Sequence, residues 1–371
     1  MSERTGLNVR ERRMSSLNLN TLKEWVFLKY LHWRTRPAPI KKYLKLKNIT
    51  RTHNCSHPNQ EKIRVGACQL KLKLLSDPLE YVEMMYQKVD AAAKEGVQLL
   101  VFPENNSFHL LGLLPGIEEM GSKAAGTNGN NSSVKVGDIF RVVGPIFNRV
   151  AQTSFSSLAA AYGMYIMAGS YLTPEREGIF NRAYLYGPDG QLMGTQDKAH
   201  LMPVENDWGL SRGSGFQIFS TPLGRLGMPV CMDATYFETF RILEYLGADV
   251  VMVPIANPEP YNYWLALRGI WPRVQESLVY GIKSALVGDL LGYTLTGKSG
   301  IFAPLELTPK GDGVLAEVIN PKEEALVTAE INLLALEELK KNHPYLGDRN
   351  DNLQKKYFPG IYSEVEKTPK T

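Results

Sequence analysis

The sequence predicts an α/β protein with a mixed β-sheet, and three observations support this. From residue 62 onward, short apolar runs of strand length alternate with longer amphipathic segments of helical periodicity. The turn sequence GPDG at residues 187–190 follows one such run and indicates antiparallel pairing as well. Of the 371 residues, 44% are hydrophobic and 22% charged, which excludes a chain that is disordered throughout. No stretch approaches the roughly 18 consecutive apolar residues of a spanning helix, which excludes a polytopic membrane protein.

The first 62 residues differ in charge from the rest of the chain. They hold 14 Lys/Arg and 4 Asp/Glu, a net charge of +10, whereas the remainder holds 28 basic and 34 acidic residues, a net charge of −6. Residues 19–33 carry apolar side chains at helical spacing. Pro37 and Pro39 are expected to break this helix, and a basic stretch at residues 41–47 and a polar linker follow. We therefore expect a basic helical extension over residues 1–61.

Beyond this extension, strands and helices are expected to alternate. Runs rich in Val, Ile, Leu, Phe and Tyr predict strands at residues 63–69, 97–102, 164–170, 181–186, 225–231, 248–255, 284–287, 299–303, 314–319 and 325–331. Amphipathic spacing predicts helices at residues 78–95, 138–162, 237–246 and 270–281, the last broken early by Pro272. The Gly/Asn/Ser-rich segment 121–137 is expected to be a flexible loop.

Three polar residues lie where an apolar strand or a turn ends, namely Glu104, Lys198 and Cys231. Side chains at the carboxyl ends of strands in open α/β sheets face the usual ligand crevice. Each residue alone has an ordinary structural interpretation: an inert buried cysteine, a solvated turn carboxylate and a surface lysine. Together they could do chemistry, because a buried carboxylate can take the proton of a thiol and a lysine can stabilise an oxyanion.

This combination resembles the nitrilase superfamily, the carbon–nitrogen hydrolases. The matching segments are VQLLVFPE before Glu104, FNRAYLYGPDGQLMGTQDKAHLMPVE around Lys198, and LGRLGMPVCMDATYFETFRILEYLGADVVMVP around Cys231. The resemblance covers residues 62–362, leaving a C-terminal tail at 363–371. It implies an αββα sandwich with a Glu–Lys–Cys triad.

The resemblance also implies a role for each residue. Cys231 would attack the amide carbon and form a thioester, and Glu104 would act as general base. Lys198 and the backbone N–H of Met232 would hold the oxyanion, while Glu205 would position the other groups. The sequence Cys231–Met232–Asp233 favours amide over nitrile hydrolysis within the superfamily. Gln196–Asp197 and Glu276–Ser277 depart from the residues that many members carry near the site, so the substrate itself is not predicted.

We therefore expect a hydrolase that cleaves a non-peptide amide and releases a carboxylate with ammonia or an amine, without a cofactor or a metal. Three alternatives stay open: an acyltransferase that uses the same thioester with an amine acceptor, a nitrile hydrolase, and a non-catalytic scaffold. The aromatic segment at residues 257–264 is either a wall of the substrate pocket or a surface loop.

Partners and location are expected from composition and from the resemblance. The superfamily implies a homodimer or larger homo-oligomer, with the helix at residues 237–246 as the candidate interface. Three cysteines without metal-ligand spacing, and no apolar signal region, favour the cytoplasm. The basic extension is interpreted as a solvated arm, as a helix packed on the domain or a neighbouring subunit, or as an interfacial helix on anionic lipid. Specific nucleic-acid binding is not expected.

Overall fold

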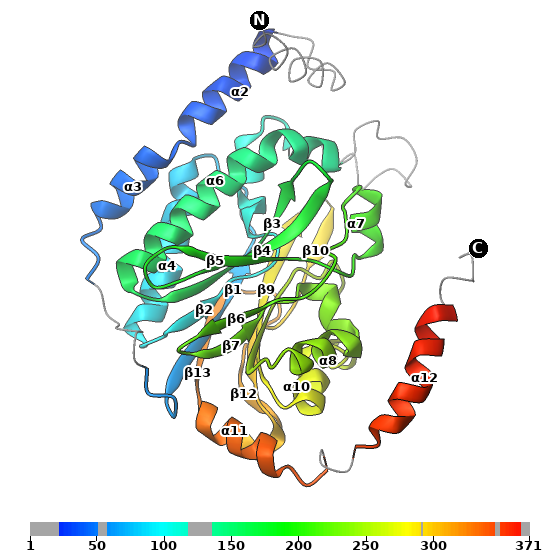
Figure 1. Ribbon diagram of the computed structural model, residues 1–371. Helices are drawn as coiled ribbons and strands as arrows, with labels where there is room; N and C mark the ends of the chain where they lie inside the picture. The colour runs from blue at the N-terminus through cyan, green and yellow to red at the C-terminus, as the bar shows by residue number, and fades with distance from the viewer. Residues whose placement is uncertain (1–21, 51–57, 118–135, 291, 346–348, 365–371) are drawn as a thin grey trace, which may run out of the picture.

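The computed structural model describes residues 22–50, 58–117, 136–290, 292–345 and 349–364. Its centre is a 13-stranded sheet with the order β5-β4-β3-β2-β1-β9-β8-β7-β6, to which β10–β13 attach (Figure 1). The strands are β1 Ile63–Lys71, β2 Leu99–Val101, β3 Tyr165–Pro174, β4 Ile179–Tyr186, β5 Leu192–Asp197, β6 Ile218–Thr221, β7 Gly224–Gly227, β8 Val250–Ile255, β9 Tyr280–Leu290, β10 Tyr293–Leu295, β11 Gly300–Phe302, β12 Val314–Glu317 and β13 Ala325–Ile331.

The described helices precede, separate and follow these strands. They are α2 Leu22–Arg34, α3 Pro37–Lys45, α4 Pro78–Lys94, α6 Val136–Tyr162, α7 Pro203–Asp207, α8 Phe237–Tyr245, α9 Tyr263–Ala266, α10 Ile270–Ser277, α11 Leu333–Asn342 and α12 Asp351–Glu364, with short 3-10 helices η1 Asn106–Leu113, η2 Cys231–Thr235 and η3 Leu305–Leu307. No helix in the described part of the chain is long and apolar enough to cross a membrane.

The sheet is mixed, as the sequence predicts. Strands β7, β8, β9, β1, β2 and β3 pair in parallel, whereas β4, β5, β6 and β13 join antiparallel. The sheet has two halves, β1–β5 with β13 and β6–β9 with β11 and β12. They join where β1 meets β9, through the pairs Leu70–Leu286 and Lys71–Val287. This short junction lets the two halves turn their inner faces toward each other.

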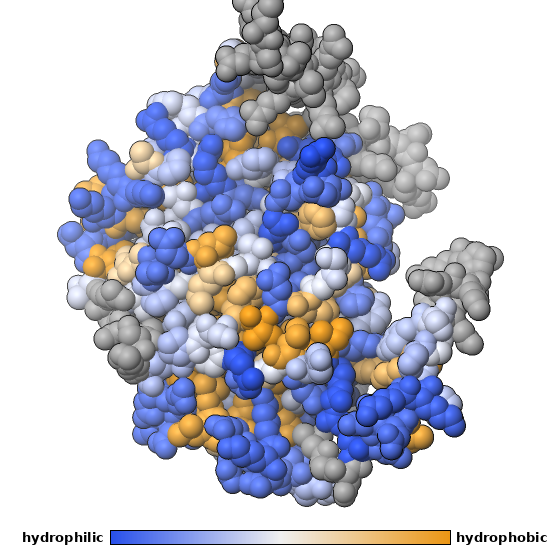
Figure 2. Space-filling view, viewed as in Figure 1, coloured by the Kyte–Doolittle hydropathy of each residue, from blue (hydrophilic) through white to orange (hydrophobic). Residues whose placement is uncertain are grey.

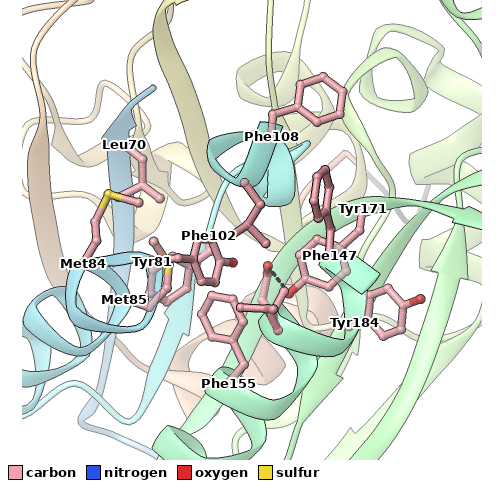
Figure 3. Close-up of a cluster of buried hydrophobic side chains, with 14 of the residues drawn as sticks. Leu70, Tyr81, Met84, Met85, Phe102, Phe108, Phe147, Phe155, Tyr171 and Tyr184 are labelled. Carbon is pink, nitrogen blue, oxygen red and sulfur yellow. Dashed lines mark hydrogen bonds between the residues drawn. The ribbon is translucent and has the colours of Figure 1, made fainter. Parts of the chain in front are cut away.

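Alternating side chains of the central strands enter two different cores. Val65 of β1 lies in a core that it shares with Val250 of β8, from the opposite half of the sheet. Leu70, on the other face of β1, packs in a second core with Tyr81 of α4 and Phe147 of α6 (Figure 3). Because strand side chains alternate between faces, one strand serves both cores.

Each half of the sheet is covered on its outside by helices. Helices α4 and α6 cover the first half through the second core. Helices α8 and α10 cover the second half, where Gly227 of β7 faces Leu243 and Gly281 of β9 faces Val274. The layers therefore run helix, sheet, sheet, helix, which confirms the expected αββα sandwich.

The N-terminal extension differs from the expectation in one respect. The helix predicted around residues 19–33 is present as α2, but the prolines after it do not lead into an irregular basic stretch. Pro37 and Pro39 begin a second helix, α3, whose Ile40 and Leu44 are buried. Proline fits the first turn of a helix, where no backbone N–H donor is needed. The same residues therefore end one helix and begin another.

Smaller differences concern the ends of elements. Helix α10 ends at Ser277, because Leu278 adopts the left-handed conformation, so β9 begins at Tyr280 within the predicted helix. Strand β7 ends at Gly227, four residues before Cys231. The predicted loop at residues 121–137 lies almost wholly outside the described residues, and its last two residues begin α6.

Candidate active site

Glu104 is held at the end of β2 by a close contact with β3. Its side chain is 1% exposed. Strand β3 bulges between Met167 and Ser170, and Gly169 within the bulge has φ +73°, where an added Cβ would overlap the carbonyl oxygen of Pro103. Asn105, also left-handed at φ +54°, donates its backbone N–H to Ser170 Oγ at 3.2 Å. The glutamate therefore lies on a backbone that is fixed on both sides.

Lys198 follows β5 and lies between two carboxylates. Its side chain is 1% exposed, and its Nζ is 2.8 Å from Glu104 Oε1 and 2.7 Å from Glu205 Oε2. Glu205, on α7, also accepts the backbone N–H of Met202 at 2.9 Å. The negative charge beside this buried ammonium favours its protonated form.

Asn181 of β4 is a second donor that connects the same two carboxylates. Its Nδ2 donates to Glu104 Oε1 at 2.8 Å and to Glu205 Oε1 at 2.9 Å. Its side chain is buried. Asn181 and Lys198 thus supply donors from neighbouring strands, so the orientation of the Glu104 carboxylate is determined by the sheet.

Cys231 begins η2 directly after the loop that leaves β7. It has φ +47°, an uncommon conformation for a non-glycine residue and one that occurs in tight strand-to-helix turns around nucleophiles. Its Sγ is buried and lies 3.5 Å from Asn257 Oδ1. Asp233 stabilises the turn by accepting the backbone N–H groups of Val230 at 2.9 Å and His200 at 2.7 Å.

Burial and charge together set the protonation states of the cluster. Burial raises the pKa of the Glu104 carboxyl, and the charge of Lys198 opposes that rise. Burial would lower the pKa of the Lys198 ammonium, but the negative charges around it, that of Glu104 foremost, raise it above its ordinary value. Burial and the charge of Glu104 raise the pKa of the Cys231 thiol well above its usual range. The raised pKa values of Lys198 and Cys231 favour an ammonium and a neutral thiol, and the raised pKa of Glu104 makes its carboxylate a stronger base than an exposed one.

The structure brings Glu104, Lys198 and Glu205 into one hydrogen-bonded cluster, and the Cys231 thiol is close enough to influence the pKa of Glu104. Met232 follows Cys231 within η2. Asn181 and Asn257 also belong to the site, although sequence reasoning assigned them no individual role. Asn181 is polar on a strand face whose other residues, Ile179, Ala183 and Leu185, are apolar, and this alternation was the available signal for it. Among the described residues, no three His, Cys, Asp or Glu side chains are grouped so that they could hold a metal ion.

Comparison with known proteins gives one family and several relatives. The family model "Carbon-nitrogen hydrolase" matches residues 64–341. The probable hydrolase YhcX of Bacillus subtilis is 26% identical over 336 residues, which cover 88% of this chain but only 58% of that relative's length. A nitrilase of Pyrococcus abyssi is 27% identical over 273 residues, or 73% of this chain and 90% of the relative. The bovine omega-amidase NIT2 is 27% identical over 210 residues, or 53% and 72%.

Solved structures share the fold. An amidase of Nesterenkonia AN1 from the nitrilase superfamily aligns with a TM-score of 0.57 and 20% sequence identity, over 81% of this chain and 99% of the other. At this identity the likeness concerns the fold alone. It agrees with the αββα layers that the strand pairing and the two cores build.

Proposed function

The chain belongs to the carbon–nitrogen hydrolase family, and we propose that it hydrolyses a non-peptide amide through a thioester on Cys231. The observation that carries the proposal is the buried cluster in which Lys198 Nζ lies 2.8 Å from Glu104 and 2.7 Å from Glu205, beside a buried thiol. Burying three charged groups is costly, and general base catalysis with oxyanion stabilisation gives this arrangement a chemical use.

The first step forms the thioester. Because the pKa of the Cys231 thiol is raised, the sulfur carries its proton at neutral pH and needs a base in order to attack. Glu104 takes this proton as Sγ adds to the amide carbon, and the carbonyl oxygen becomes an oxyanion. Lys198 and the backbone N–H of Met232 stabilise that oxyanion. When the carbon–nitrogen bond breaks, Glu104 gives the proton to the leaving nitrogen, which departs as ammonia or an amine.

The second step releases the acid. Glu104, again ionised, removes a proton from water as the water adds to the thioester carbon. The second tetrahedral intermediate collapses, the carbon–sulfur bond breaks, and the proton returns to Sγ. The products are a carboxylic acid and the free thiol, and no other reactant is consumed. Glu205 and Asn181 act as positioning residues in both steps, since each is hydrogen-bonded to a group that reacts or to its partner.

An amide is favoured over a nitrile by the residues after the nucleophile, and the relatives include an omega-amidase as well as a nitrilase. Cys231 is followed by Met232 and Asp233, the order typical of amidase branches, and bovine NIT2 is named an omega-amidase. Because identities with all three relatives are below 30%, the substrate panel should include small aliphatic amides, ω-amido acids, carbamoyl compounds and the corresponding nitriles.

The test is ammonia release from this panel by the wild type, Cys231→Ala and Cys68→Ala. Cys68, on β1, is the other cysteine in the described part of the chain and is fully buried outside the site, so its variant controls for the loss of a buried thiol. We expect Cys231→Ala to lose turnover and Cys68→Ala to keep it. Intact mass measurement should show an acyl adduct on wild type and none on Cys231→Ala.

Turnover that survives in Cys231→Ala would contradict the proposal. A product formed only with an added amine acceptor would instead indicate acyl transfer.

A further inference from the structure

The N-terminal extension is fixed to the catalytic body through one face of its helices. Leu31 of α2 and Ile40 and Leu44 of α3 are buried in the core that α4 and α6 share. Arg149 of α6 donates to Thr35 Oγ1 at 2.7 Å and to the carbonyl oxygen of His32 at 3.1 Å. The extension is thus part of the packed structure over residues 22–50, and its orientation is determined.

Two ion pairs also hold the extension to α4 and to its N-cap residue, Asp77. Arg34 Nη2 is 2.6 Å from Asp77 Oδ2, and Lys47 Nζ is 2.6 Å from Glu83 Oε2. These pairs use the basic residues that face inward. Figure 1 shows α2 and α3 following one another along the flank of the domain that α6 covers. Their other face is directed away from the catalytic body.

The outward face of α2 carries large apolar and aromatic side chains. Trp25 is 52% exposed and Trp33 57% exposed, and Val26 and Tyr30 lie between them on the same face. Lys29 lies over the ring of Trp25 at 5.4 Å, and Arg36 lies over the ring of Trp33 at 4.7 Å. Tryptophan and tyrosine next to Lys and Arg are typical of helices that lie in a membrane interface, where the rings and aliphatic stems enter the apolar layer and the charges stay near the headgroups.

Beyond Glu24, near the start of α2, the charge of this segment has one sign. Between residues 25 and 50 there are 7 Lys/Arg and no Asp or Glu. Two of the seven form the ion pairs to α4. Five have no carboxylate partner among the described residues and are exposed, namely Lys29, Arg36, Lys41, Lys42 and Lys45. We propose that α2 and α3 form a docking surface for an anionic membrane, which holds the catalytic domain at the lipid surface.

Other partners fit this surface less well. A second copy of the chain would bring the same basic patch onto itself in a symmetric dimer, so like charges would face each other. A nucleic-acid duplex would neutralise the charge but would leave Trp25, Val26 and Trp33 in water, because phosphate contacts do not bury apolar side chains. A single strand could stack bases on the aromatic rings, but it would leave the aliphatic side chain of Val26 in water. Anionic lipid pairs with the charges and buries both the aliphatic and the aromatic groups.

The test is flotation of the full-length protein with vesicles of phosphatidylcholine alone and of phosphatidylcholine mixed with phosphatidylserine. We expect binding only to the anionic vesicles, and weaker binding as salt rises. The charge-reversal variant Lys41→Glu/Lys42→Glu should reduce the bound fraction roughly ten-fold or more, since each basic residue near the surface contributes to the attraction. Trp25→Ala/Trp33→Ala should reduce it on the same vesicles.

Helix α12 offers matched controls. Lys355 and Lys356 are also adjacent and exposed, Lys356 lies over the ring of Tyr357 at 4.9 Å, and Tyr357 is 53% exposed. The variants Lys355→Glu/Lys356→Glu and Tyr357→Ala should float as the wild type does. No flotation of the wild type with anionic vesicles would overturn the proposal, and so would equal loss in the two charge-reversal variants. Self-association that Trp25→Ala/Trp33→Ala abolishes, without flotation, would assign the surface to protein contacts and would also overturn it.

Discussion

At the scale of single residues, the site depends on polar side chains that do not react. Asn181 is the clearest case, because its amide donates to both Glu104 and Glu205, and on Glu104 it shares the oxygen Oε1 with Lys198. Hydrogen bonds to an ionised carboxylate favour the charged form and lower its pKa. Asn181 therefore works against the burial that raises the pKa of Glu104. Together with Lys198, Asn181 therefore favours the ionised form that a general base needs.

The first prediction concerns Asn181→Leu, which keeps the volume and removes both N–H donors. The pKa of Glu104 should rise further, so the acidic limb of the kcat/KM profile should move to higher pH. The loss in kcat/KM at neutral pH should be on the order of ten-fold, as for a hydrogen bond to a charged group. Asn148→Leu is the control, because Asn148 is also buried and donates to Leu172 O and Thr173 Oγ1 outside the site. An unmoved acidic limb in Asn181→Leu would refute the positioning role.

The second prediction concerns His109, in the 3-10 helix η1 just after Glu104. Burial lowers the pKa of its imidazole to about 4, from an ordinary value of 6.5, and its Nδ1 accepts the backbone N–H of Lys73 at 3.1 Å. Between about pH 4 and pH 6.5, His109 is protonated in the unfolded chain and neutral in the folded one, so the unfolded chain binds more protons. The contribution of neutral His109 is therefore complete above the ordinary pKa and is lost as the pH falls toward the folded pKa.

Urea unfolding at about pH 7 and about pH 5 measures this effect. The free energy of unfolding of the wild type should drop at the lower pH by an amount of order 1 kcal/mol or more, since one pKa unit corresponds to about 1.4 kcal/mol. His109→Asn keeps an acceptor for Lys73 and cannot titrate, so its loss should be smaller. His343→Asn, near the surface beside Glu306, should behave as the wild type. An equal drop in His109→Asn would show that other groups cause the pH dependence.

At the scale of elements, the geometry of the site depends on one irregularity in the sheet. The bulge in β3 lets Gly169 approach Pro103, and that contact fixes the loop that carries Glu104. Gly169 combines a positive φ with a lack of space for a Cβ. The bulge therefore connects sheet geometry directly to the position of the proposed base.

The third prediction is that Gly169→Ala displaces Glu104. Because a shift of about 1 Å in a catalytic group can cost on the order of a hundred-fold in rate, kcat should fall by roughly that factor while the protein stays folded. Gly311→Ala provides the matched control, since Gly311 also has a positive φ, +62°, but no atom lies within 4 Å of an added Cβ. Its cost is limited to backbone strain of about 1 kcal/mol. Kinetics and thermal melting of both variants separate the two effects.

Local patterns predicted the elements well where one signal acted alone. The amphipathic spacing over residues 78–95 and the apolar run over residues 97–102 predicted α4 (Pro78–Lys94) and β2 (Leu99–Val101) with small errors at their ends. The pattern failed at Pro37, where a helix-breaking residue also begins a helix. Glu104, Lys198 and Cys231 were singled out from their positions at strand and turn ends. Asn181 was not, because its role arises from two partners that are distant in sequence and meet only in the folded sheet.

At the scale of the whole molecule, the arrangement of the two sheet halves could not be read from local sequence. They join through the short β1–β9 contact, between residues more than two hundred positions apart. The resemblance to the superfamily supplied this layer order, and the strand pairing agrees with it. The same resemblance implies a homo-oligomer, and the helix at residues 237–246 is our candidate for its interface.

The fourth prediction concerns this interface. Helix α8 exposes apolar side chains at Phe237, Ile242 and Tyr245, the last 86% exposed, and Figure 2 shows hydrophobic residues gathered over the region of β6, β7 and α8. A symmetric dimer would bury such a face against its own copy. Sedimentation velocity should therefore show a dimer or larger assembly for the wild type and a shift toward monomer for Tyr245→Asp.

The control is Tyr345→Asp, at a residue that is 79% exposed, and this variant should sediment as the wild type does. A monomeric wild type would exclude the oligomer, and unchanged sedimentation of Tyr245→Asp would exclude α8 as its interface. The basic surface of α2 and α3 lies on a different flank (Figure 1), so the α8 contact would leave it free to bind lipid.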